Sequence, residues 1–246
     1  MRLQLVSDLH TEFYPDPVMF VESLAFEPGL DFLLVPGDVV TSGQPPSSVR
    51  GVLQALSSKA RHVVYTVGNH EYYHNGPGGR QQTEDTLAAN MPGNFHWLRN
   101  SAEEIDGVEF FGGPLWFPDD PDNEKYSRQL NDFGLIRGFR DWVYQENREF
   151  VSQAVRLVRD STVVLSHHIP ATEAIAPQYR GDKLNRFFVS DMGWLIRERQ
   201  PRLWVFGHTH TPADLRVGEA RLLCNPYGYP HERWRQQPYP PVVAEL

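Results

Sequence analysis

The chain has 246 residues, 40% of them hydrophobic, which is enough apolar material for the core of a globular domain. Its formal net charge of -8, with no lysine- or arginine-rich block, argues against a broad surface for long nucleic acids or anionic membranes. The single cysteine, Cys224, excludes an internal disulfide framework, and no apolar run approaches the roughly 20 residues of a membrane-spanning helix.

The first ten residues, MRLQLVSDLH, become polar by the seventh and lack the apolar region of a signal peptide. Together with the cysteine content, this predicts a soluble, cytoplasmic protein. No repeat, low-complexity segment or clear linker interrupts the sequence. We therefore expect one domain over residues 1–246.

Five short apolar runs in chain order have the same form: each is often β-branched and ends abruptly at a polar residue or a glycine. They are residues 3–7 (LQLVS), 31–37 (DFLLVPG), 62–68 (HVVYTVG), 161–167 (STVVLSH) and 202–208 (RLWVFGH). Continuous rather than alternating hydrophobicity predicts strands buried on both faces. Further strands are predicted within 107–117 and 218–230.

Helices are predicted between these strands, over residues 47–60, 143–160 and 188–200. The second shows apolar residues at i, i+3 and i+4 spacing, which is typical of an amphipathic helix. Ser47 and Ser190 are the expected N-caps. The alternation of strands and helices predicts an α/β fold, and the additional strands favour two packed sheets with helices outside.

The segment 113–142, rich in proline, aspartate and aromatic residues, is predicted to be a long loop or a small cap inserted into the domain. Loops of this length in compact domains are often functional. We therefore expect it to border a site.

Polar residues of only three types follow the five runs. In chain order they are Asp8 and His10, Asp38, Asn69 and His70, His167 and His168, and His208 and His210. In an α/β sheet, ligands bind beyond the carboxyl ends of the strands. Aspartate, asparagine and histidine suit borderline or hard divalent metals. These side chains are therefore expected to meet at one metal-binding crevice.

Alternation along a strand end is expected to aim Asp8 and His10 to the same side, and likewise His208 and His210. The neighbouring glycines and prolines allow tight turns and a close approach of the backbone. Each motif alone is weak, because a polar residue after a strand is often only part of a turn. The ordered set of five makes the metal site the favoured interpretation.

The motifs DLH, GD, GNHE, SHH and GHTH, in this order from Asp8 to His210, resemble those of the calcineurin-like metallophosphoesterases. The resemblance implies a four-layer α/β/β/α sandwich of two mixed sheets with flanking helices. It also implies a binuclear metal centre at the strand ends.

Carried over by position, the resemblance implies two sets of ligands that share the Asp38 carboxylate as a bridge. The first metal would be held by Asp8, His10, Asp38 and His210, and the second by Asp38, Asn69, His167 and His208. His70 would be the catalytic histidine that binds no metal. In the doubled HH, His167 is preferred because the ligand directly follows the strand's last serine, and His168 is the alternative.

Two departures narrow the placement within the family. Thr41 stands where the purple acid phosphatases carry a tyrosine ligand, so no phenolate-to-iron bond is expected. The protein serine/threonine phosphatases carry an aspartate at that position and an arginine where this chain has Val67. The partner that would orient His70 is therefore unassigned, and the chain looks most like bacterial single-domain members.

The chemistry that the resemblance implies is phosphoester hydrolysis, in which a metal-bound hydroxide attacks phosphorus in line. His70 would protonate the leaving group. Two divalent ions are expected, Mn or Fe first, with Zn, Co and Ni compatible with the same ligands. A small phosphoester is the expected substrate.

The loops beside the motifs supply the expected substrate contacts. These are Tyr72, Tyr73, His74, Trp116, Asn131 and Asp132. Monoesters and diesters, cyclic nucleotides included, remain alternative substrates, because they share this type of centre. A mononuclear hydrolase would leave one ligand set unused. A non-catalytic scaffold is disfavoured because all seven ligand positions and His70 are present.

Overall fold

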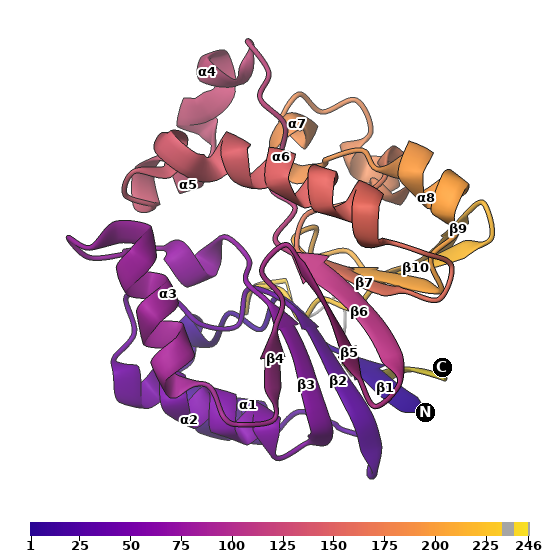
Figure 1. Cartoon of the computed structure of the whole chain (residues 1–246). Helices are drawn as coiled ribbons and strands as arrows, with labels where there is room; N and C mark the ends of the chain where they lie inside the picture. The colour runs from indigo at the N-terminus through magenta and orange to yellow at the C-terminus, as the bar shows by residue number, and fades with distance from the viewer. Residues whose placement is uncertain (233–238, 246) are drawn as a thin grey trace.

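A computed structural model describes residues 1–232 and 239–245. Two β-sheets pack face to face, and helices cover their outer faces (Figure 1). This arrangement is the predicted four-layer α/β/β/α sandwich. Both sheets are mixed, as expected, because parallel strands in each are flanked by antiparallel ones.

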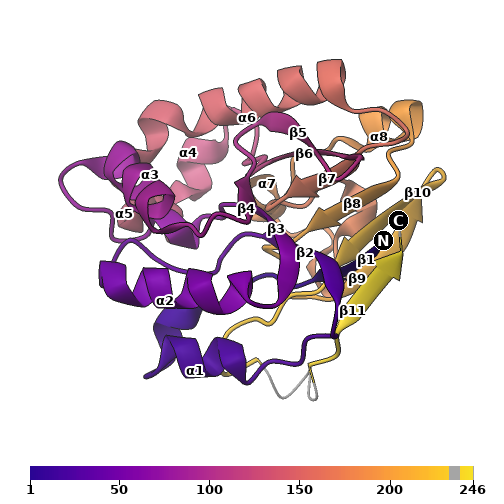
Figure 2. The same ribbon diagram turned by 60° about the horizontal axis from the view of Figure 1, so that its bottom comes forward.

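The first sheet has the strand order β11-β1-β2-β3-β4. Its strands are β1 (Arg2–Leu5), β2 (Leu30–Pro36), β3 (Ala60–Thr66), β4 (Phe95–Trp97) and β11 (Val242–Glu245). All pairs are parallel except β1 with β11, which brings the last strand of the chain beside the first (Figure 2). The carboxyl ends of β1, β2 and β3 therefore meet at one edge.

The second sheet has the order β5-β6-β7-β8-β10-β9. Its strands are β5 (Ser101–Ile105), β6 (Val108–Gly113), β7 (Val163–Ser166), β8 (Leu203–Phe206), β9 (Ala213–Val217) and β10 (Ala220–Cys224). Strands β6, β7, β8 and β10 are parallel, and the antiparallel β5 and β9 form the two edges. At the β5–β6 turn, Asp106 and Gly107 both have positive φ, as a two-residue hairpin of type I′ requires.

Burial on both faces explains the continuous apolar runs. In β2, Phe32 and Leu34 pack in the layer between the two sheets, while Leu33 and Val35 pack on the helix side. Successive side chains of a strand point to opposite faces of the sheet. Both faces of β2 are covered, one by the other sheet and one by helices, so residues 32–35 are all apolar.

Helices cover the outer face of each sheet (Figure 1). On the first sheet lie α1 (Pro17–Glu22), α2 (Pro46–Ser57) and α3 (Gly79–Asn90), and on the second α6 (Phe139–Leu157) and α8 (Gly193–Arg199). The remaining α-helices are one-turn elements: α4 (Asn123–Tyr126), α5 (Asp132–Leu135) and α7 (Asn185–Phe188). The segment 113–142 thus forms α4, α5 and the start of α6.

The helix starts differ from the prediction. Ser47 lies inside α2, whose N-cap position is Pro45. Ser190 lies two positions before Met192, the N-cap residue of α8, and instead accepts a 2.8 Å hydrogen bond from the Asn147 amide. Helix α3 was not predicted because its sequence has a weak apolar pattern, with Leu87 as its one buried hydrophobic residue.

The longest helix, α6, is amphipathic and packs on the second sheet. In residues 1–232 and 239–245, no helix combines the length and the apolar character that a membrane crossing requires.

Candidate metal centre

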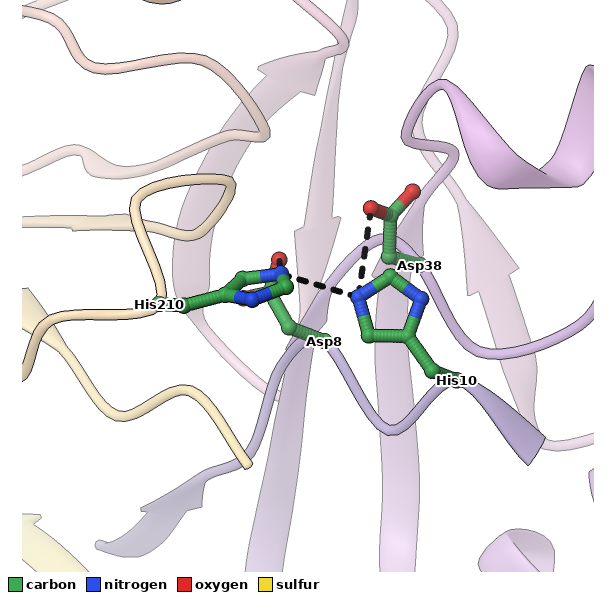
Figure 3. A group of neighbouring side chains, drawn as sticks. All are labelled: Asp8, His10, Asp38 and His210. Atoms are coloured by element: carbon green, nitrogen blue, oxygen red, sulfur yellow. Dashed lines mark hydrogen bonds and ion pairs between the residues drawn. The ribbon is translucent and has the colours of Figure 1, made fainter. Parts of the chain in front are cut away.

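The predicted ligands come together at the edge where the parallel strands of both sheets end. Asp8, His10, Asp38 and His210 place one potential ligand atom each within 4.8 Å of one another (Figure 3). Asp38, His167 and His208 form a second such group. Asp38 belongs to both groups, which is the position that a bridging carboxylate needs.

Most of these side chains are directed to the centre by a left-handed backbone conformation and not by the alternation of residues along a strand. Strand β1 ends at Leu5 and β8 at Phe206, so the ligand pairs that follow lie in loops. Positive φ angles occur at Asp8 (53°), His10 (46°), Asp38 (56°), His208 (67°) and His210 (49°). This conformation is uncommon for residues other than glycine, and such strain clusters at functional sites. The expectation that strand alternation aims these pairs is therefore wrong, because the pairs lie beyond the strand ends.

Two glycines allow the loops to approach closely. A Cβ atom at Gly68 would lie 2.2 Å from Asp38 Oδ1 and 2.6 Å from His167 Cε1. At Gly207 it would lie 2.7 Å from Asp8 Oδ2. The glycines of GNHE and GHTH are thus required by the packing of the centre.

The tautomer of His167 follows from its backbone partner. Its Nδ1 lies 2.8 Å from the Pro36 carbonyl oxygen and donates to it, so Nε2 faces the centre. Nε2 lies 3.0 Å from Asn69 Oδ1, 3.2 Å from His208 Nδ1 and 3.4 Å from Asp38 Oδ2. Three potential acceptors therefore surround one nitrogen. A proton or a cation among these atoms would relieve the repulsion between their lone pairs.

The titration of this cluster favours a proton at His167. Burial lowers the pKa of His167, but the Asp38 carboxylate outweighs it and raises the value to about 9. Burial likewise raises the pKa of Asp38, yet the charges of His167 and His70 hold it well below its usual range. Without metal a proton supplies the positive charge at His167, and a cation bound there would replace it.

The side chain of Asn69 is fixed with its oxygen toward the centre. Its Nδ2 donates to Asp132 Oδ1 at 2.9 Å and to the Tyr73 hydroxyl at 3.1 Å. The Tyr73 hydroxyl in turn donates to Asp132 Oδ1 at 2.6 Å. Asp132 therefore positions the side chain of Asn69, a role that its place in the sequence does not indicate.

In the first group too, atoms that can accept a hydrogen bond face one another around the centre. His210 Nδ1 lies 2.7 Å from Glu232 Oε2 and donates to it, which turns Nε2 toward the centre. That Nε2 lies 2.9 Å from His10 Nε2 and 3.6 Å from Asp8 Oδ1. Burial raises the pKa of Glu232, but its bond to His210 prevails and lowers the value to about 2. Glu232 is thus an ionised carboxylate that orients a histidine, as in many metal sites.

The two histidines of the doubled motif have different surroundings. His168 Nδ1 lies 3.1 Å from the Pro114 carbonyl oxygen, and its ring packs 5.0 Å from that of Trp116. Burial lowers the pKa of His168 to about 3. Among the described residues, His167 joins the group around Asp38 and His168 does not. The geometry favours His167 as the ligand.

His70 begins the short 3-10 helix η2 (His70–Tyr72), and its ring lies 4.2 Å from that of His10 in the first group. Its Nδ1 lies 2.7 Å from Glu12 Oε1, and its Nε2 lies 3.1 Å from the Tyr229 hydroxyl. Its ring stacks on Tyr73 with centroids 4.1 Å apart. Burial lowers the pKa of His70, but the Asp38 and Glu12 carboxylates raise it above its usual value.

Glu12 is the orienting partner that the sequence left unassigned. The same Oε1 atom lies 3.4 Å from Nδ1 of His10, so one carboxylate contacts both a predicted ligand and His70. Its side chain is largely buried beside them. The only sequence signal is an acidic residue two positions after His10 in DLHTE, on the short helix η1 (Thr11–Phe13).

Glu71, the last residue of GNHE, connects the loop after β2 with the loop after β3. Its carboxylate accepts backbone N–H groups of Asp38 (3.0 Å), Val39 (2.7 Å) and Gly68 (2.6 Å). Its role is structural, because these bonds hold the Asp38 loop against the turn that carries Asn69.

A cavity of about 340 Å³ opens beside both groups. Of the predicted substrate contacts, Tyr73, Asn131 and Asp132 line it. The other three do not line it. Tyr72 is buried with its hydroxyl bonded to Glu84, Trp116 is fully buried among aromatic rings, and His74 is exposed beside Gly43.

One known protein is similar to this chain over nearly its whole length. The chain is 27% identical over 269 residues to an uncharacterized protein, L509, of Acanthamoeba polyphaga mimivirus, with 96% of this chain and 94% of that protein covered.

Solved structures share the fold. A phosphopantetheinyl hydrolase (PptH) from Mycobacterium tuberculosis superposes with a TM-score of 0.74 at 18% identity, covering 98% of this chain and 95% of that one. The protein TT1561 of Thermus thermophilus superposes with a TM-score of 0.54 at 12% identity, covering 92% and 88%.

The sequence model of calcineurin-like phosphoesterases matches residues 1–212, which contain every predicted metal ligand. The resemblance seen in the motifs is therefore confirmed. The clusters of histidine and aspartate agree with metal-dependent hydrolysis of phosphoesters, the general activity of this class. The chain belongs to the calcineurin-like phosphoesterase family and is a metallophosphoesterase.

Proposed function

We propose that the chain hydrolyses small phosphoesters at a centre of two divalent metals, with in-line attack of water on phosphorus. Bound metals would lower the pKa of that water and neutralise the phosphoryl oxygens. The residues proposed to hold them are Asp8, His10, Asp38 and His210 for one metal, and Asp38, Asn69, His167 and His208 for the other.

One observation supports the proposal most strongly: histidine ring nitrogens and side-chain oxygens face one another around Asp38. The nitrogens of His167 and His210 that face the centre are those left over when the other ring nitrogen donates outward, to Pro36 and Glu232. Outward donation with an inward lone pair is the usual arrangement of metal-binding histidines.

His70 is proposed to donate a proton to the leaving oxygen. Glu12 accepts from Nδ1, so a protonated ring presents its other N–H, at Nε2, beside the Tyr229 hydroxyl. The raised pKa of His70 favours the protonated ring that a general acid needs.

Manganese or iron is the proposed metal. The ligands combine carboxylate, amide and imidazole groups without thiolate, and Cys224 is buried in the core outside both groups. Such a mixture also accepts Zn, Co or Ni, so availability selects among them.

The test begins with chelator-treated protein that is reloaded with Mn²⁺ and assayed on p-nitrophenyl phosphate, bis-p-nitrophenyl phosphate, nucleotides and cyclic nucleotides. Metal-dependent turnover is expected for at least one ester. His70→Ala is expected to retain metal and to lose about 10²- to 10⁴-fold in kcat. Equal turnover with and without metal would contradict the two-metal proposal, and unchanged kcat in His70→Ala would contradict the role of His70.

A further inference from the structure

One wall of the cavity beside the proposed metal centre is apolar. The segment between β7 and β8 forms it with Ile169, Ile175, Ala176, Leu184 and Phe188. Ile169 and Ala176 are buried, and the other three are partly exposed toward the cavity they line. At about 340 Å³, the cavity has room for an organic group besides a phosphoryl group.

The apolar wall and His70 adjoin different ligand groups of the centre. The Phe188 ring lies 4.5 Å from that of His208, in the second ligand group. The His70 ring lies 4.2 Å from that of His10, in the first group. Because Asp38 belongs to both groups, a phosphorus atom beside Asp38 would have His70 next to the first group and the apolar wall next to the second.

A carboxyl group also lines the cavity on the same segment. Asp182 lies between Ile175 and Leu184 in the sequence and is exposed. An anionic substituent on the phosphorus would meet a like charge there, and like-charge contacts disfavour a ligand. An uncharged substituent would avoid this repulsion and gain from burial against the apolar wall.

We infer that the substrate is a small phosphodiester whose retained ester group is uncharged and apolar and binds against Ile175, Leu184 and Phe188. This inference rests on the proposed function. The oxygen of water forms the new P–O bond and the bond to the other alcohol breaks. The products are that alcohol and a phosphomonoester that keeps the apolar group, with one water consumed and no change of oxidation state.

A series of p-nitrophenyl phosphodiesters that share the p-nitrophenol leaving group tests the ester group that stays on phosphorus. Methyl, butyl and 3-carboxypropyl esters differ only in the group expected at the apolar wall. The ratio kcat/KM should rise up to about fourfold per methylene from methyl to butyl. The carboxypropyl ester should fall below the butyl ester by at least about tenfold. Equal values for methyl and butyl, or a preference for the carboxylate, would overturn the inference.

Two variants make the test residue-specific. Ile175→Ser should lower the butyl-to-methyl ratio of kcat/KM by at least about threefold. Val155→Ser is the matched control: this side chain is 36% exposed on α6 and does not line the cavity, so the ratio should not change. Using a ratio removes any difference in the fraction of folded protein. An unchanged ratio in Ile175→Ser would contradict the assigned wall.

Binding separates this inference from the proposed function. Calorimetry with the Mn²⁺-loaded chain should give a lower Kd for dibutyl phosphate than for dimethyl phosphate, and Ile175→Ser should reduce the difference. If dibutyl phosphate binds more tightly but no ester is hydrolysed, the proposed function is refuted and the apolar subsite is not. Hydrolysis with equal Kd values would refute the apolar subsite alone.

Discussion

At the scale of single residues, the centre combines ligands that the sequence reveals with positioning groups that it hides. Asp38 and His167 stand in motifs whose order is recognisable. Glu12 and Asp132 do not, because their roles depend on loops that bring them to His70 and Asn69 across 58 and 63 positions of the chain. Spacing within a motif carries no information about such a distant partner.

Glu12→Gln tests whether this carboxylate positions His70. The amide keeps the size of the side chain but loses the charge that favours the protonated ring. We expect kcat to fall about 10- to 100-fold for esters with a poor leaving group such as phenol. The loss should be small for 2,4-dinitrophenol, which departs without a proton.

The control for this variant is Glu27→Gln, a partly exposed glutamate that pairs with Arg2 away from the centre. It should leave both rates unchanged. An equal loss in Glu12→Gln for good and poor leaving groups would show that Glu12 does not act through proton transfer.

Asp38→Asn tests the bridge. Because Asp38 belongs to both groups, the variant should weaken both metals together, by about tenfold or more each in a calorimetric Mn²⁺ titration. Asp8→Asn is the matched comparison, since Asp8 belongs to one group and should weaken one metal. Retention of either site at full affinity in Asp38→Asn would refute a shared ligand.

At the scale of elements, continuous apolar runs predicted the five strands that lead to the centre, because burial on both faces leaves a clear pattern. Their ends were less predictable: β1 stops at Leu5, and the following ligands are aimed by left-handed backbone. Helix α3 was missed because its buried face includes the polar residues Thr83 and Glu84, which bond Ser42 and Arg99 outside the helix. The spacing of apolar residues does not predict a helix whose buried face is held by polar contacts with distant parts of the chain.

Gly68→Ala tests the close approach of the loops after β2 and β3. Its Cβ would overlap Asp38 Oδ1, so the carboxylate or the turn must shift. We expect a loss of about 1–3 kcal/mol in the free energy of unfolding. Metal affinity should fall more strongly, because both sites share Asp38. Chemical denaturation and a Mn²⁺ titration measure the two effects.

Gly93→Ala is the control for this variant, because a Cβ there meets nothing within 4 Å. It should change neither stability nor metal affinity appreciably. Wild-type metal affinity in Gly68→Ala would mean that the centre does not need this contact.

At the scale of the whole molecule, the two-sheet sandwich followed from alternating strands and helices together with the family motifs. The centre lies where loops from both sheets meet, so metal binding should stabilise the packing of one sheet against the other. Each site filled at 100 times its Kd adds about 2.7 kcal/mol to the free energy of unfolding. For a chain of this size, two sites should raise Tm by roughly 10 °C or more.

Differential scanning calorimetry of the chelated chain with increasing Mn²⁺ measures this shift. Asp38→Asn should show little of it at the same concentrations. A Tm that does not depend on Mn²⁺ in the wild-type chain would contradict a preformed metal centre.

The most direct measurement is anomalous diffraction from crystals of the Mn²⁺-soaked chain. Two cation peaks about 3.5–4 Å apart, with the Asp38 carboxylate between them, are the predicted result. A single peak, or two peaks of which one lacks Asp38 as a neighbour, would contradict the binuclear centre.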